Sequence, residues 1–162
     1  VTVSQRLAMM RLGVTGDARL RVDDREILRA TPSFSLDTLK ELRHELGPDR
    51  ALTMVIGMDS FLSLPTWKGW QSLMHYGHIL VVSRPGWELD LQPELNHFCE
   101  NYRACSVAEL QCAPAGKLWF ETLTALSISS SMIRSLSRED KSIAYLVPEP
   151  VQTYINANKL YR

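Results

Sequence analysis

Apolar residues follow two different spacings along this chain, and each spacing predicts a different kind of element. An apolar residue at every third or fourth position is typical of an amphipathic helix. This pattern occurs over residues 5–12, 35–45, 67–75 and 148–158. Short apolar runs rich in branched residues are typical of buried parallel strands. Such runs occur at residues 52–56, 78–83 and 117–123.

Weaker signals complete the predicted order of elements. Ser4 is a candidate N-cap for the first helix, and residues 20–22 suggest a short strand. Pro93 and Pro114 bracket a segment of weak periodicity, in which one or two irregular helices are expected. Because strands alternate with helices, we predict a single α/β domain over residues 1–162, built on a Rossmann-like, doubly wound parallel sheet.

Composition narrows the classes of function. The chain of 162 residues carries 18 Lys and Arg against 18 Asp and Glu, so no overall field favours nucleic acid or an anionic membrane. No apolar run approaches the roughly 20 residues that span a bilayer, and the first residues do not resemble a signal peptide. The three cysteines lack a C-x-x-C pair, which indicates neither a disulfide framework nor a zinc site. We therefore expect a cytoplasmic protein without a metal site of its own.

Polar and glycine-rich segments follow the predicted strands, at the edge where doubly wound sheets bind ligands. These segments are Gly57 with Asp59, Arg84 to Gly86, and residues 129–134. Ser129, Ser131 and Arg134 fall at a predicted helix start, where free N–H groups and the helix dipole favour anions. This arrangement suits a polyphosphate and indicates nucleotide chemistry. The alternative is structural, because Ser is a common N-cap and Arg is ordinary on an exposed helix face.

A series of short motifs runs in order along the chain. They are Pro32-Ser33-Phe34-Ser35 followed by Asp37-Thr38-Leu39, Ile56-Gly57-Met58-Asp59-Ser60, Leu64-Pro65-Thr66-Trp67, Arg84-Pro85-Gly86, Ile128-Ser129-Ser130-Ser131-Met132-Ile133-Arg134, and Leu146-Val147-Pro148 through Tyr154-Ile155 to Leu160-Tyr161-Arg162. Each motif alone is weak, but together they closely resemble bacterial nicotinate-nucleotide adenylyltransferases. The resemblance covers the chain except for the stretch between Trp87 and Pro114.

The resemblance implies a reaction of NAD biosynthesis. The phosphate of nicotinate mononucleotide attacks the α-phosphorus of ATP, with Mg²⁺ screening the charges, and nicotinate adenine dinucleotide and pyrophosphate are formed. It implies catalytic roles for Arg134 and Ser131, which would contact the ATP phosphates together with Ser129. Gly57 and Arg84 are further expected contacts of ATP, although Arg84 is equally well explained as a solvated side chain. ATP and nicotinate mononucleotide are thus the expected partners, and a homo-oligomer stays open.

The same resemblance implies a site for the pyridine ring. Trp67 resembles the family's aromatic platform, and the backbone N–H groups of Ser35 and Lys68 match the positions that bind the ring carboxylate, so the acid should be preferred over the amide. Phe34 and Ser35 replace the usual Tyr and Thr, changes that a backbone contact survives. Asp59 is expected near a ribose hydroxyl. Without the resemblance, Trp67 would be interpreted as a core aromatic. For Gly57 and Asp59 the alternative is a strand-end turn with an Asp cap.

The family's proteins have further elements before the position that matches Val1. These are a strand, a turn of the form G-G-T-F-D-P-V-H-x-G-H, a helix and a second strand, so the chain is expected to be N-terminally truncated and incomplete for catalysis. His75-Tyr76-Gly77-His78 matches H-x-G-H, but it precedes a predicted strand and is interpreted as a helix end. The alternatives are another adenylyltransferase of the same fold and a noncatalytic nucleotide-binding or interaction module.

Overall fold

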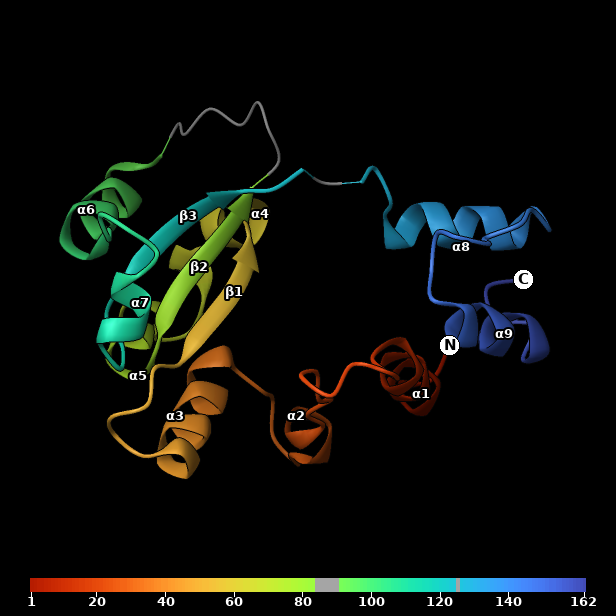
Figure 1. Cartoon of the computed structure of the whole chain (residues 1–162), viewed down its shortest axis with the longest axis horizontal. Helices are drawn as coiled ribbons and strands as arrows, with labels where there is room; N and C mark the ends of the chain where they lie inside the picture. Colours follow the sequence, from red (N-terminus) through yellow and green to blue (C-terminus); the bar gives the residue numbers. More distant parts are fainter. Residues whose placement is uncertain (84–90, 125) are drawn as a thin grey trace. The chain divides into compact units, whose positions relative to one another are not determined.

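The computed structural model describes residues 1–83, 91–124 and 126–162. It divides into two compact units, which are Val1–Ala30 with Leu126–Arg162, and Thr31–Ala125. We call the second the sheet unit, because it contains the strands of the described residues, and the first the terminal unit (Figure 1). The single domain expected from the sequence stays a prediction.

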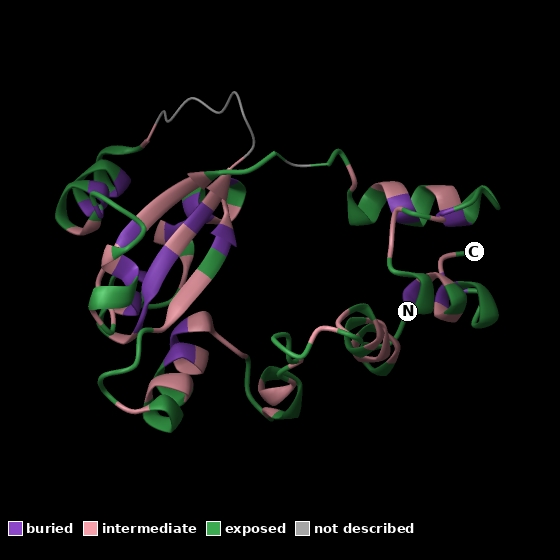
Figure 2. Cartoon of the chain, viewed as in Figure 1, coloured by how far each residue is buried: buried purple, intermediate pink, exposed green. Residues whose placement is uncertain are grey.

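The sheet unit is built on three parallel strands in the order β1-β2-β3. The strands are β1 Thr53–Gly57, β2 His78–Ser83 and β3 Leu118–Thr122. In their register, Thr53 lies opposite His78, and Ile79 lies opposite Leu118. Buried positions follow the central strand β2 (Figure 2). The apolar runs therefore form a parallel sheet as predicted, and the α/β class is confirmed.

Helices of the sheet unit connect and flank these strands. They are α3 Ser35–Leu46, α4 Met58–Leu62, α5 Leu73–Tyr76, α6 Pro93–Tyr102 and α7 Glu109–Cys112, with the 3₁₀ turns η1 Leu64–Thr66 and η2 Trp70–Ser72. α4 packs on β1 and β2, and α3 packs against α5. The core between them includes the fully buried side chains of Phe61, Leu64 and Ile79. The helix predicted over residues 35–45 is confirmed, and so are two helices between Pro93 and Pro114.

The continuous helix predicted over residues 67–75 is wrong in its first half. Gly69 adopts a left-handed conformation with a φ of 65° and interrupts the helical geometry. A Cβ at Gly69 would also lie 2.6 Å from Leu36 Cδ2, so a side chain there would require the Leu36 side chain to move. Trp67 is extended, with φ −80° and ψ 141°, and regular α-helix begins only at Leu73. The break keeps Trp67 out of the helix.

The terminal unit consists of helices from both ends of the chain. They are α1 Val3–Gly13, α2 Arg25–Leu28, α8 Ser130–Arg138 and α9 Glu149–Ala157. α1 packs on α9, and a small apolar core is formed by Ile133, Ile143, Val151, Ile155 and Leu160. The helices predicted after Ser129 and over residues 148–158 are confirmed. In the described parts of the chain, every helix is too short or too polar to cross a membrane.

Two predictions for the terminal unit are wrong. The N-cap of α1 is Thr2 rather than Ser4, because Thr2 and Gln5 form a reciprocal capping box in which each side chain accepts the other's backbone N–H. Residues 20–22 form coil instead of a strand. A strand requires a neighbouring backbone to pair with, whereas Leu20 is exposed and α2 follows shortly after.

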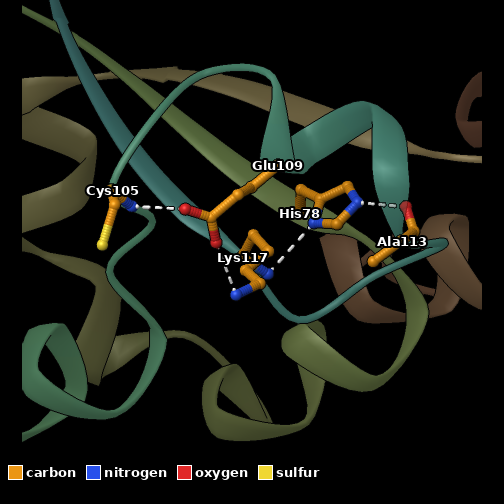
Figure 3. A network of polar contacts seen from close by, with 5 residues as sticks. All are labelled: His78, Cys105, Glu109, Ala113 and Lys117. Atoms are coloured by element: carbon orange, nitrogen blue, oxygen red, sulfur yellow. Dashed lines mark hydrogen bonds and ion pairs between the residues drawn. The ribbon is translucent and has the colours of Figure 1, made fainter.

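The His75-Tyr76-Gly77-His78 segment ends α5 and begins β2, so its interpretation as a helix end is confirmed. His78 is fully buried. Its Nδ1 accepts the Lys117 backbone N–H at 3.0 Å, and its Nε2 lies 2.8 Å from the Ala113 carbonyl oxygen (Figure 3). Because Nδ1 accepts, the ring proton resides on Nε2, which donates to Ala113. His78 therefore joins the start of β2 to the loop before β3.

Glu109 forms an ion pair beside this histidine. Its carboxylate accepts hydrogen bonds from the Lys117 ammonium at 2.7 Å and from the Cys105 backbone N–H at 2.8 Å (Figure 3). The Lys117 contact first, and the Cys105 contact second, hold the pKa of Glu109 below its usual value. Because the folded pKa lies below the unfolded one, the ionised carboxylate stabilises the fold fully above about pH 4.3, and this contribution is lost as the pH falls through the folded value.

We expect Glu109→Gln to be less stable than the wild type near neutral pH, by a small amount because the pair is solvent-accessible. The amide oxygen of the substituted side chain would still accept the Cys105 N–H, so the comparison isolates the charge. The difference should disappear as the pH falls well below about 4. Urea midpoints measured at a series of pH values test this, and a difference that stayed constant into acid would contradict it.

Candidate functional site

One pocket of the sheet unit, with a volume of about 250 Å³, brings together four residues that the sequence singled out. These are Phe34, Ser35, Trp67 and Lys68. Ser33, Leu36, Thr66 and Leu73 complete its lining. The sequence did not single out Ser33 and Thr66, whose hydroxyls also line the pocket. The signal that could have found them is their position in the same motifs as Phe34 and Trp67. We call this cavity the Trp67 pocket.

The backbone around Trp67 is held by turns on both sides. Its N–H donates to the Leu64 carbonyl oxygen at 2.9 Å, which closes η1, and its own carbonyl oxygen accepts the Trp70 N–H at 3.2 Å. The indole is half-buried and packs against the core of the sheet unit. A ring fixed in this way, with part of its surface in the pocket, offers a rigid platform for a flat ligand.

The start of α3 forms another wall of the pocket. Phe34 is the N-cap residue, and its carbonyl oxygen accepts the N–H groups of Asp37 and Thr38 at 2.9 and 3.2 Å. The side chain of Phe34 makes no capping hydrogen bond to this helix. The N–H of Ser35 precedes the first intrahelical bond, so it has no partner within the helix. The helix dipole is positive at this end, and one carboxylate, Asp37, already lies in the first turn without lining the pocket. The wall therefore offers N–H donors and a positive dipole to a further negatively charged group.

Lys68 places a cation at the same wall. Its Nζ lies 4.3 Å from the centre of the Phe34 ring, within the range of a cation–π interaction. Among the described residues that line the pocket, Lys68 has the one charged side chain. Two features therefore make the electrostatic potential in the Trp67 pocket more positive. They are the start of α3 and the Lys68 ammonium.

Gly57 and Asp59 lie where β1 ends. Gly57 is the last residue of β1 and precedes α4, and Asp59 is exposed in the first turn of that helix. A Cβ at Gly57 would lie 2.7 Å from Asp59 Oδ1. The absence of a side chain at Gly57 therefore makes room for the Asp59 carboxylate. Contacts of Gly57 with ATP and of Asp59 with a ribose stay predictions.

The predicted phosphate contacts lie in the terminal unit. Ser129 is the N-cap of α8, and its Oγ accepts the Met132 N–H at 3.1 Å, as the capping alternative expected. Its hydroxyl proton is still available to an anion. Arg134 Nη2 donates to Ser131 Oγ at 3.2 Å, and both side chains are exposed. α8 thus groups three donors near its start, while Arg84 lies outside the described residues.

Comparison with known proteins gives three findings. Residues 1–136 match the family model for cytidylyltransferase-like proteins. Proteins named as probable nicotinate-nucleotide adenylyltransferases are similar along the chain. One from Marinomonas sp. (strain MWYL1) is 64% identical, and the match covers 100% of this chain and 73% of the relative. One from Hahella chejuensis is 44% identical, and the match covers 96% of this chain and 71% of the relative. A solved structure of Plasmodium falciparum nicotinic acid mononucleotide adenylyltransferase complexed with NaAD shares the fold, with a TM-score of 0.67 at 17% identity over 99% of this chain and 75% of that one.

Proposed function

Because this chain belongs to the cytidylyltransferase-like family, and within it to the nicotinate-nucleotide adenylyltransferases, we propose how its site residues divide the work of adenylyl transfer. The enzyme transfers the adenylyl group of ATP to nicotinate mononucleotide in NAD biosynthesis. The Trp67 pocket binds the pyridine end of the acceptor, and the start of α8 binds the phosphates of ATP.

The composition of the Trp67 pocket is the observation that supports the acceptor site. A pyridine ring bearing a carboxylate is flat, electron-poor and anionic, and it therefore needs an aromatic face beside donors and positive charge. The Trp67 indole supplies the face. The backbone N–H groups of Ser35 and Lys68 bind the carboxylate, and Asp59, at the end of β1, accepts a hydrogen bond from the ribose.

The reaction requires alignment of two polyanions more than it requires a nucleophile of the protein. The acceptor phosphate attacks the α-phosphorus of ATP and pyrophosphate leaves, without a covalent enzyme intermediate, so the protein contributes positioning and charge compensation. Arg134 presents a planar guanidinium to the phosphates. Ser131, bonded to that guanidinium, holds its orientation, and the hydroxyls of Ser129 and Ser131 add donors. Arg84 and Gly57 are further ATP contacts.

Magnesium accompanies ATP in this proposal. The described residues contain no group of three or more His, Cys, Asp or Glu that could hold a metal ion, so they form no protein cage for it. Mg²⁺ commonly binds through substrate phosphates and water with few protein ligands. We therefore assign no step of the reaction to a metal held by this chain.

The test is the choice between acid and amide acceptors. With ATP and the intact enzyme, kcat/KM for nicotinate mononucleotide should exceed that for nicotinamide mononucleotide by on the order of 10²-fold, since the amide leaves the donors of the Trp67 pocket poorly matched. Pyrophosphate release measured with both acceptors decides this. Turnover of the amide as good as that of the acid would contradict the proposed acceptor and favour another adenylyltransferase of the same fold.

A further inference from the structure

Two lysines of the sheet unit lie over aromatic rings, and they differ in what surrounds them. Lys68 Nζ is 4.3 Å from the centre of the Phe34 ring and lines the Trp67 pocket. Lys40 Nζ is 5.6 Å from the centre of the Tyr76 ring and is not part of that pocket. The shorter contact restrains the ammonium of Lys68 at the pocket wall, although the side chain as a whole is exposed.

The pocket contains nothing that neutralises this ammonium. None of its described lining residues is acidic, and within the described part of the chain no ion pair of Lys68 is found. The Phe34 ring attracts the cation through its quadrupole but carries no net charge. A ligand with a carboxylate would therefore supply the missing negative charge, whereas a ligand with a carboxamide would not.

We propose that the Lys68 ammonium, held over the Phe34 ring, is a specificity determinant that favours an aromatic carboxylate over the matching carboxamide in the Trp67 pocket. The inference rests on the proposed function and assigns to the Lys68 side chain a role separate from that of its backbone N–H. Phe34 acts as a positioning residue, since it restrains the ammonium without touching the substrate through a polar atom.

The experiment compares the acid-to-amide ratio of kcat/KM in the intact enzyme and three variants. Lys68→Met removes the charge and keeps an unbranched apolar stem, and we expect the ratio to fall about fivefold, the size of one solvent-accessible charged contact. Lys68→Arg keeps the charge and the contact with an aromatic ring, so the ratio should stay near that of the wild type. Lys40→Met, the matched control, removes a lysine from the same kind of contact outside the pocket and should also leave the ratio unchanged.

A second measurement separates a charge effect from a change of shape. Calorimetric binding of nicotinate mononucleotide, without ATP, should weaken as salt is raised in the wild type, because the attraction to the ammonium is screened. Lys68→Met should bind more weakly and show a smaller salt dependence. Phe34→Leu removes the ring that restrains the ammonium. It should lower the affinity and the salt dependence as well, but by less than Lys68→Met does.

Each outcome is decisive. A wild-type ratio and salt dependence in Lys68→Met would overturn the inference while the proposed function stands. An equal fall of the ratio in Lys40→Met would overturn it as well, because the effect would not be specific to the pocket. If the wild type itself did not prefer the acid, the proposed acceptor would fail first, and the inference with it. Thermal melts of all variants check that each is folded.

Discussion

Arg134→Ala should lower kcat/KM for adenylyl transfer by about 10²–10³-fold, the cost of removing one preorganised donor to a developing charge. The guanidinium of Arg134 is exposed in α8 and is oriented by its 3.2 Å bond to Ser131 Oγ. In the transition state, charge moves onto the leaving pyrophosphate, and a planar cation can donate two parallel hydrogen bonds to it. The loss should appear mainly in kcat, because the contact strengthens as the charge develops. Initial rates at varied ATP measure both parameters.

Two further variants bracket this prediction. Arg138→Ala removes an exposed arginine from the last turn of the same helix, and its kcat/KM should stay close to that of the wild type. Arg134→Lys keeps the charge but loses the planar fork, so it should recover only part of the activity. If Arg134→Ala retained the wild-type dependence on ATP, Arg134 would have to be removed from the site.

His78→Ala should lower the free energy of unfolding by about 3 kcal/mol, and it is the second large effect we expect. The ring is fully buried and bonded at both nitrogens, to the Lys117 N–H and the Ala113 carbonyl oxygen. Alanine leaves a cavity at the start of β2 and also leaves these two backbone groups without their partner. Urea unfolding at neutral pH measures the loss as a lower midpoint with an unchanged slope.

His75 provides the matched control for His78. It lies in the same H-x-G-H segment but is exposed at the end of α5, so His75→Ala should change stability by less than about 0.5 kcal/mol. His78→Phe fills most of the volume but satisfies neither backbone group, and should still be clearly destabilised. A His78→Ala midpoint equal to that of the wild type would show that these hydrogen bonds are worth nothing in the folded protein.

The main elements of the sheet were predictable because each is encoded within a few consecutive residues. The run at residues 78–83 is almost uniformly apolar, as a strand covered on both faces must be, and it became β2. The apolar spacing at residues 35–45 likewise became α3. Signals that depend on one residue were less secure. Thr2 and Ser4 are both good caps by type, and only the bonds with Gln5 select Thr2.

The residues of the proposed ring site were singled out from motifs, but the shape of the Trp67 pocket was not predicted. The pattern of apolar residues around Trp70 continues across Gly69, so periodicity extended the helix back to Trp67. The left-handed conformation of Gly69 breaks the helix before Trp70. The local sequence does not report this break, because a glycine permits a left-handed conformation without requiring it. The grouping of Trp67 and Lys68 with Phe34 in one pocket likewise required the fold.

The amino-acid sequence by itself determined the alternation of strands and helices, the parallel sheet, and the family with its chemistry. Those properties follow from periodicity and from short motifs, which are local. Only the tertiary structure decided what each polar side chain touches. Arg43 looks like an ordinary helix charge, yet its guanidinium donates to the carbonyl oxygens of Tyr76 at 2.9 Å and Pro114 at 2.6 Å. Such partners are far apart in sequence, and they are set by strand register and packing, which no local pattern records.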